Sequence, residues 1–282
     1  MNPVTGEITY LEAVRAGLRD ALTADERVFL LGEDIGHFGG AFGVTAGLWE
    51  EFGDSRVLDT PIAEEGFVGA AIGAAWVGER PVVELQFADF VSCPFDMLTT
   101  VAAKTHWRSG LALPLVVRAP FGAGVRGGPF HASSPEGWFV GTPGLKVVCP
   151  GTVEDAYGLT RAAIEDDDPV LVFEHKALYR RLRGPAPDPA TRTPIGRAKV
   201  IREGTDATVV TYGAGVAWAL DAANRIDGAV EVLDLRTVWP LDEDAVLTSL
   251  AKTSRLLVVQ EAARSAGAGA HVLSLVARDG FE

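Results

Sequence analysis

Short apolar runs alternate with longer amphipathic stretches along most of the chain. In its first part, runs rich in β-branched residues predict strands at Arg27–Leu31, Pro81–Leu85, Pro114–Arg118, Leu145–Val148 and Pro169–Phe173. The stretches between them have helical periodicity, at Tyr10–Leu22, Glu64–Val77, Pro94–Arg108 and Val153–Glu165. Strands separated by helices indicate βαβ crossovers. We therefore expect an α/β fold, with a mostly parallel sheet that has helices on both faces.

A proline-rich stretch divides the chain. Residues 182–194 read LRGPAPDPATRTP, a composition typical of a linker, so we expect one domain over residues 1–181 and a second over 195–282. The second domain has strands predicted at Ala207–Tyr212, Val230–Leu235 and Leu256–Gln260, and helices at Val216–Arg225, Glu243–Lys252 and Gly269–Arg278. No closing strand follows the last helix. The predicted pattern of this second domain therefore ends abruptly.

Composition and charge exclude several classes of protein. The chain has 282 residues, 48% hydrophobic and 22% charged, with a net charge of −13, so it lacks the basic surface that nucleic-acid binding needs. The longest apolar stretch, Phe67–Gly78, is too short to span a membrane, and the N-terminus has no signal-peptide pattern. Cys93 and Cys149 are far apart, which favours a reducing compartment. We expect a cytoplasmic protein with neither nucleic-acid nor membrane partners.

Glu64 is the first candidate for chemistry. It opens a predicted helix directly after a strand-to-helix turn, where ligands bind in open α/β sheets, although a carboxylate there can also simply complement the helix dipole. The helix carries Gly66, Gly69 and Gly73, each less favourable than alanine by about 1 kcal/mol. Either another backbone approaches this helix closely, or the glycines reflect tight core packing alone.

A long glycine-rich segment, FGAGVRGGPFHASSPE, spans residues 121–136. Long loops of this kind in compact domains are often functional, and His131 within it is a candidate acid–base group, or else a solvated surface histidine. Ser133 or Ser134 is expected to cap a following helix, with Glu136 closing a capping box.

Other patterns give weaker signals. The strand ELQFADF places Gln86 and Phe90 near the expected sheet edge, as an amide and a stacking surface or as an ordinary strand end. The remaining histidines show no metal-ligand spacing, so we expect no metal ligands in this chain. Gly213 and Gly215, with Asp234 further on, imitate a dinucleotide-binding turn, but Trp218 stands where that motif needs a third glycine.

Together these residues make the chain similar to a known family, the β subunit of the thiamine-diphosphate-dependent first component of 2-oxo acid dehydrogenases. The resemblance runs from about Tyr10 to the C-terminus. It rests on the segments LLGEDIG, DTPIAE, ELQFADF, AAKTHWRSG, PGLKVVCP and VLDLRTVWP and on the loop with His131. The segments HFGG (His37–Gly40), ELQFADF and LYR (Leu178–Arg180) make it most similar to the branched-chain, or 2-oxoisovalerate, type.

The resemblance implies a transketolase-like pyrimidine-binding domain followed by a transketolase C-terminal domain. Because members of the family usually continue past this end, we expect the C-terminal domain to be incomplete, as a truncated sequence or as a short variant. It further implies an α2β2 assembly with thiamine diphosphate at each α–β interface, and a lipoyl-bearing acyltransferase as a further partner. The α subunit of this family supplies the diphosphate and magnesium site through a GDG…N motif, which this sequence lacks.

The resemblance also assigns roles to individual residues. Glu64 matches the glutamate that hydrogen-bonds N1′ of the aminopyrimidine and favours its imino tautomer. Ile62, Gln86 and Phe90 match positions that contact the same ring. Glu33 matches an acidic residue near the cofactor with a role in proton transfer. His131 matches a histidine that steadies the decarboxylation intermediate and assists acyl transfer to lipoamide.

Three departures from the family pattern concern the cofactor ring and the substrate side. Phe90 replaces the tyrosine usual in the branched-chain type, the loop reads HASS where the family usually reads HSQS, and Gly141 replaces a second histidine. We expect oxidative decarboxylation of a branched-chain 2-oxo acid. The alternatives are pyruvate or acetoin at the same site, a non-catalytic assembly subunit, and, on the pattern around Gly213, a dinucleotide-binding dehydrogenase.

Overall fold

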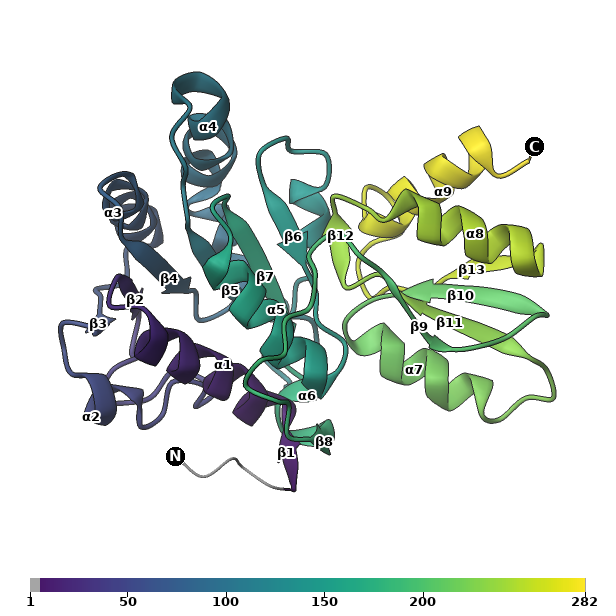
Figure 1. Cartoon of the computed structure of the whole chain (residues 1–282), viewed down its shortest axis with the longest axis horizontal. Coiled ribbons are helices and arrows are strands. Elements are labelled where there is room, and N and C mark those ends of the chain that lie inside the picture. The colour runs from purple at the N-terminus through teal and green to yellow at the C-terminus, as the bar shows by residue number, and fades with distance from the viewer. Residues whose placement is uncertain (1–5, 282) are drawn as a thin grey trace.

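The computed structural model describes residues 6–281. Two lobes of unequal size lie side by side, the larger built from the first part of the chain and the smaller from the last part (Figure 1). Each lobe has a sheet with helices packed on it, so the α/β prediction is confirmed.

The sheet of the larger lobe has seven strands in the order β12-β6-β7-β5-β4-β2-β3. In chain order the strands are β2 (Val28–Gly32), β3 (Val57–Asp59), β4 (Arg80–Glu84), β5 (Val116–Phe121), β6 (Lys146–Val148), β7 (Val170–His175) and β12 (Thr237–Trp239). All neighbours are parallel except β12 and β6. The five strands expected in this lobe are present, while the three-residue strands β3 and β12 were not predicted.

Helices cover both faces of this sheet. One face carries α1 (Tyr10–Ala24), α2 (Leu48–Phe52) and α5 (Val153–Glu165); the other carries α3 (Glu64–Trp76), the π-helical turn η2 (Met97–Ala102) and α4 (Ala103–Ser109). Three single turns, η1 (Ala88–Ser92), η3 (Glu136–Phe139) and α6 (Leu178–Arg181), follow strands. A capping box between Thr9 and Glu12 fixes the start of α1.

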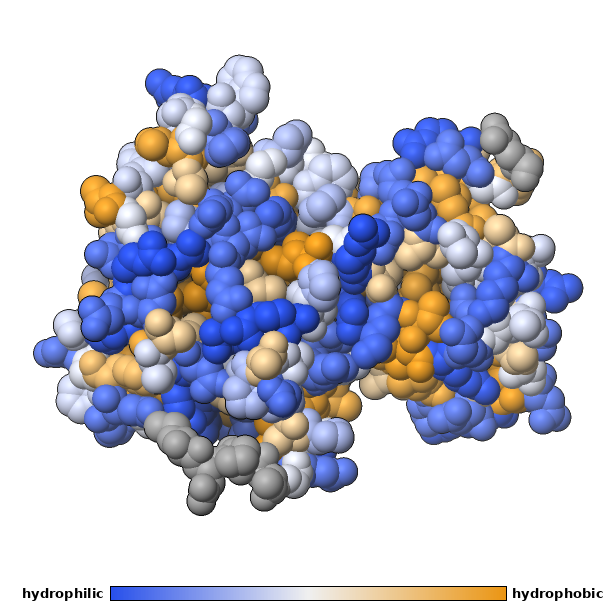
Figure 2. Space-filling model, viewed as in Figure 1, coloured by the Kyte–Doolittle hydropathy of each residue, from blue (hydrophilic) through white to orange (hydrophobic). Residues whose placement is uncertain are grey.

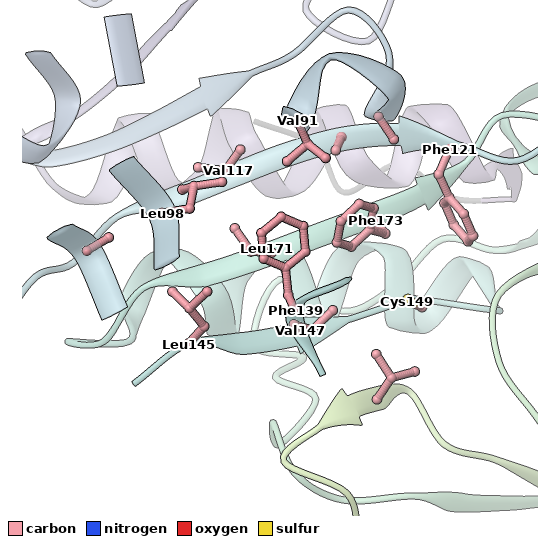
Figure 3. Close-up of a cluster of buried hydrophobic side chains, with 14 of the residues drawn as sticks. Val91, Leu98, Val117, Phe121, Phe139, Leu145, Val147, Cys149, Leu171 and Phe173 are labelled. Atoms are coloured by element: carbon pink, nitrogen blue, oxygen red, sulfur yellow. The ribbon is translucent and has the colours of Figure 1, made fainter. Parts of the chain in front are cut away.

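Two cores follow from the alternation of side chains along the strands. On β7, Val170 and Val172 point into the core under α1 and α5, whereas Leu171 and Phe173 point into the core under α3 and η2. Figure 3 shows part of this second core, where Phe173 on β7 packs against Phe121 from β5 and Phe139 from η3. Burial on both faces explains why the strands read as continuous apolar runs.

The smaller lobe has a four-stranded sheet in the order β13-β10-β11-β9. Its strands are β9 (Lys199–Arg202), β10 (Ala207–Thr211), β11 (Val230–Asp234) and β13 (Leu256–Val258), and its helices are α7 (Ala214–Ala223), α8 (Glu243–Thr253) and α9 (Ala268–Asp279). The pairs β10–β11 and β10–β13 are parallel, and β9 is antiparallel to β11. The expected elements are present, with β9 as an unpredicted edge strand.

The two lobes share structural elements. Strand β12, which follows β11 in the chain, joins the sheet of the larger lobe, and the core under α3 continues into side chains of β10, β11 and α9. The expected linker is also partly ordered, because β8 (Arg183–Pro185) pairs with β1 (Glu7–Thr9) and Thr193 Oγ1 donates to Asp155. The domain boundaries at residues 181/182 and 194/195 stay predictions.

Hydrophilic residues cover most of the face seen in Figure 2. None of the helices within residues 6–281 is both long enough and apolar enough to cross a bilayer. In the same residues, no three His, Cys, Asp or Glu side chains are grouped so that they could hold a metal ion. Cys93 and Cys149 are both free thiols.

Candidate active site

The predicted site residues all follow the carboxyl ends of four neighbouring strands. Glu33 follows β2, Ile62 and Glu64 follow β3, Gln86 and Phe90 follow β4, and the loop with His131 follows β5. Parallel neighbours bring these ends to one edge of the sheet, which is where ligands bind in open α/β folds. The strand order therefore places all six residues along the same edge.

Glu33 and Glu64 form a pair of buried carboxyl groups. Glu64 is the first residue of α3, and the residue before it, Ala63, offers the helix no side-chain cap. Burial raises the pKa of Glu33, and the neighbouring carboxylates of Glu64 and Asp34 raise it further. Glu33 Oε1 is buried and has no hydrogen-bond partner within residues 6–281. A buried carboxyl oxygen without a partner is costly unless a ligand or another chain supplies one.

Gln86, Phe90 and Ile62 add an amide and two apolar side chains to the same edge of the sheet. The Gln86 amide donates to Asp34 Oδ2 at 3.0 Å, which holds its orientation. Phe90 lies half-buried on the turn η1. Ile62 is 83% exposed, an unusual position for a large apolar side chain and one that favours contact with another molecule.

His131 is held by its own loop. Its Nδ1 lies 3.0 Å from the carbonyl oxygen of Gly127, and since a carbonyl oxygen can only accept, Nδ1 must carry the hydrogen. Nε2 of the neutral ring is then left with its lone pair. The imidazole packs edge-to-face on Phe87, with ring centroids 4.5 Å apart, and on Phe90 at 5.8 Å. The structure thus joins His131 to Phe90 through direct ring contact.

The expected helix cap after the glycine-rich loop is wrong. Ser133 donates from its backbone N–H and its hydroxyl to Asp89 Oδ1, and the element that follows is only the single turn η3, with no side-chain cap. Glu136, expected to close the box, instead accepts a hydrogen bond of 2.7 Å from the Tyr212 hydroxyl of the smaller lobe. Tertiary partners compete successfully here with the local capping pattern.

Three residues of the site were missed by sequence reasoning. Phe87 and Asp89 stand inside the ELQFADF segment and support His131 and Ser133, respectively. Lys176, after β7, is almost fully buried, and burial lowers its pKa to about 8. Its ammonium donates to the Pro120 carbonyl oxygen at 3.2 Å and lies over the Phe87 ring, 5.4 Å from its centroid. In the sequence, the only signal for Lys176 is its position shortly after a predicted strand.

The structure gives no support to the dinucleotide pattern around Gly213. Asp234, which would have to bind a ribose, is fully buried, and its Oδ1 accepts from the backbone N–H of Arg236 at 2.9 Å. A Cβ on Gly215 would lie 2.0 Å from Thr211 Oγ1, so this glycine serves packing between α7 and β10.

Two family profiles together match nearly the whole chain. The profile of the transketolase pyrimidine-binding domain matches residues 6–181, and that of the transketolase C-terminal domain matches residues 196–282. The chain is 46% identical over 274 residues to the 2-oxoisovalerate dehydrogenase subunit beta of Bacillus subtilis, covering 95% of this chain and 84% of that protein. It belongs to the β-subunit family of 2-oxo acid dehydrogenases.

Other members of this β-subunit family are similar to the same degree. The pyruvate dehydrogenase E1 component subunit beta of Staphylococcus epidermidis is 46% identical over 276 residues, covering 96% of this chain and 85% of that protein. A solved structure described as a split-gene transketolase, an inactive beta4 tetramer, superimposes with a TM-score of 0.79 at 22% identity, covering 97% of this chain and 87% of that one. This last likeness concerns the fold alone.

Proposed function

We propose that this chain is the β half of an enzyme that decarboxylates a branched-chain 2-oxo acid on thiamine diphosphate and passes the acyl group to lipoamide. An α subunit completes the α2β2 enzyme and supplies the magnesium site, and a lipoyl-bearing acyltransferase takes the product. The free thiols Cys93 and Cys149 agree with a cytoplasmic location for this assembly. The observation that carries the proposal is the carboxyl pair Glu33–Glu64 on the same sheet edge as the His131 loop.

The residues present fit an aminopyrimidine ring. A ring nitrogen needs a carboxyl partner, and the Glu33–Glu64 pair offers one along with an oxygen that lacks a partner within residues 6–281. The flat faces of the ring need apolar contacts, which Phe90 and the exposed Ile62 offer. Glu64 would hold a proton at N1′, while Gln86, fixed by Asp34, would bind at the ring edge.

The bound cofactor would supply an electron sink for the electron pair left when CO₂ departs. The chain's own residues handle protons. Glu33 keeps its proton to higher pH than an ordinary glutamate, so it can act as a proton donor at this edge of the sheet. His131, with Nδ1–H committed to Gly127, can accept a proton at Nε2 or return it to a substrate oxygen.

Sequence identity does not separate the possible substrates, because it is 46% both to a 2-oxoisovalerate and to a pyruvate dehydrogenase subunit. The HFGG and LYR segments favour the branched-chain acid. Pyruvate and acetoin are the alternatives, and comparing the rates of the reconstituted α–β enzyme on 2-oxoisovalerate, pyruvate and acetoin decides among them. Faster turnover of pyruvate or acetoin than of 2-oxoisovalerate would overturn the branched-chain proposal.

Calorimetry of thiamine diphosphate with magnesium tests the site itself. We expect tight binding only when the chain is assembled with its α subunit, and none in the Glu64→Ala assembly. Glu65→Ala is the matched control, since Glu65 is the next residue on α3 but is exposed. If a folded, assembled wild-type mixture binds no cofactor, the chain is a non-catalytic assembly subunit instead.

A further inference from the structure

The loop that carries His131 is closed at its base. The backbone N–H of Gly122 donates to the carbonyl oxygen of Ser133 at 3.0 Å, which brings the two ends of the loop together. On the far side of this closure, Asp89 accepts from the N–H of Ser133 at 3.1 Å. His131 is two residues from this point, so its position depends on how firmly the base is held.

The near side of the base is held by the other lobe. Glu261, three residues after the end of β13, accepts a hydrogen bond at Oε1 from the backbone N–H of Ala123 at 3.0 Å. Its second oxygen, Oε2, pairs with Nε2 of His175 at the end of β7. One carboxylate of the smaller lobe thereby ties the loop to the sheet of the larger lobe.

Space around this contact is tight. A Cβ on Gly122 would lie 2.7 Å from Glu261 Oε2 and 2.2 Å from His175 Nε2, so only glycine fits beneath the carboxylate. Gly122 also has a φ of +81°, which glycine adopts without strain. The lack of space for a Cβ and the positive φ both require glycine at position 122. Together they favour the loop conformation in which Ala123 faces Glu261.

The charge of Glu261 strengthens the contact. The hydrogen bond with His175 lowers the pKa of Glu261, and the Ala123 amide and the Lys176 ammonium lower it further. The carboxylate is therefore ionised at neutral pH and accepts a charge-assisted hydrogen bond, which is about twice as strong as a neutral one.

We propose that Glu261 is a positioning residue: from the smaller lobe, it fixes the base of the Gly122–Ser133 loop and so sets the place of His131 at the sheet edge. Glu261 acts through the loop backbone, by way of Ala123, and touches neither substrate nor cofactor. The loop-holding part of this inference follows from the contacts above. Its effect on turnover rests on the proposed function.

Hydrogen exchange measured by mass spectrometry on peptides covering residues 122–133 tests the loop directly, in the full chain. Removal of a hydrogen bond to a charged group costs about 1.5–3 kcal/mol. We therefore expect exchange in Glu261→Ala to be faster by about tenfold or more at these amides. Glu243→Ala is the control, because it removes an exposed ion pair with Arg278 in the same lobe.

Kinetics of the α–β assembly then test the link to His131. We expect Glu261→Ala to lower kcat by about tenfold with little change in cofactor affinity, and to add little to the loss caused by His131→Ala, since the two changes act on one group. A merely structural role would give losses that add. Glu261→Gln keeps an acceptor for Ala123 and should fall between wild type and Glu261→Ala in both measurements.

Unchanged exchange in a folded Glu261→Ala protein would overturn the inference, as would additive kinetic losses. If Glu261→Ala does not fold, the same two measurements on Glu261→Gln decide, because the inference requires faster exchange at the loop once the charge is lost. If the wild-type assembly has no decarboxylase activity, the proposed function fails, and the exchange experiment still decides whether Glu261 holds the loop.

Discussion

Arg118 lies in the centre of the larger sheet and is almost completely buried. Its Nε and Nη2 donate to the two oxygens of Glu174 at 2.7 Å each, and Nη1 donates to Glu84. The Tyr179 hydroxyl adds a further bond to Glu174 at 2.7 Å. These residues form a closed polar cluster on β4, β5, β7 and α6, directly beneath the sheet edge that carries the candidate site.

Arg118→Met should destabilise the fold strongly, because it leaves the carboxyl groups of Glu84 and Glu174 buried without their partner. We expect the free energy of unfolding, measured in urea, to fall by about 3–5 kcal/mol. The variant in which Glu84 and Glu174 are also replaced by leucine should recover much of this loss. A loss below about 1 kcal/mol for Arg118→Met alone would contradict this view of the cluster.

Gly127→Ala should disturb His131 while leaving the cofactor residues alone. A Cβ on Gly127 would lie 2.7 Å from the Cβ of His131 and 3.2 Å from its carbonyl oxygen, so one of the two residues must move. We expect about a tenfold fall in kcat of the assembled enzyme, with unchanged thiamine diphosphate affinity in calorimetry. In Gly228→Ala, the control, the new methyl meets only an ordinary contact at 3.6 Å. Wild-type kcat in Gly127→Ala would show that the place of His131 is not critical.

Helix α3 carries several glycines that the contacts within residues 6–281 do not explain. The sequence suggested that its glycines allow another backbone to approach, yet a Cβ would meet nothing within 4 Å at Gly73, and only ordinary contacts at Gly66 and Gly69. Within residues 6–281, then, no close neighbour accounts for them. The same helix begins with Glu64 and ends at Trp76, and both Trp76 and the next residue, Val77, are exposed. Large apolar side chains exposed in this way favour a subunit contact along the helix.

Gly73→Ala should have opposite effects on the stability of the isolated chain and on its association with the α subunit. In the isolated chain it should raise the free energy of unfolding by about 1 kcal/mol, since alanine is the better helix former and the methyl has open space. In the assembled enzyme it should weaken association, measured by ultracentrifugation with the α subunit. Ala70→Ser, on an exposed position of α3, is the control. Undiminished assembly would place the subunit contact elsewhere.

The regular elements were predictable from the sequence because their signal is local. Apolar runs such as Val170–Phe173 are continuous since both faces of the sheet are covered, and helix α3 was predicted to within one residue. Glu64 was singled out because it opens a helix after a strand, and His131 because it lies in a long glycine-rich loop, whereas Glu33 was proposed only from the family resemblance. The strands β3, β8 and β12 could not be predicted, because each has only three residues and, unlike the equally short β6 and β13, none lies in a longer apolar run.

The contacts that hold the His131 loop in place also could not be predicted from the sequence. Asp89 holds Ser133 across 44 positions, and Glu261 holds Ala123 across 138. No periodicity connects residues so far apart. The capping box expected at Ser133–Glu136 shows how distant residues can also override a local pattern. The sequence pattern for the box is present, but Ser133 bonds to Asp89 and Glu136 bonds to Tyr212 instead.

Between the two lobes, Asp234 makes the stability of the protein depend on pH. Burial, together with the neighbouring carboxylate of Asp155, raises the pKa of Asp234 from 3.8 to about 8, although the hydrogen bond from Arg236 and the charges of Arg236 and Lys199 act to lower it. Arg236 is bound to Asp155 at 2.7 Å. A proton is therefore held more tightly in the folded than in the unfolded chain.

Because the folded pKa of Asp234 is the higher one, its protonated form favours folding. We expect the stability it contributes to be complete below about pH 4 and to be lost as the pH rises to about 8. Asp234→Asn should flatten this part of the curve when the free energy of unfolding is measured by urea titration at each pH. Asp227→Asn, on an exposed loop, is the control. Parallel curves for wild type and Asp234→Asn would contradict the assignment.

The sharing of β12 between the lobes bears on how the chain is made in the cell. Residues 146–148 form β6 and leave the ribosome long before Thr237–Trp239, their partner on the outer side of the sheet. During that interval the edge of the nascent sheet is open to pairing with other chains. Ribosome-bound chains that stop short of residue 237 should therefore depend on chaperones, and this dependence should end when β12 emerges.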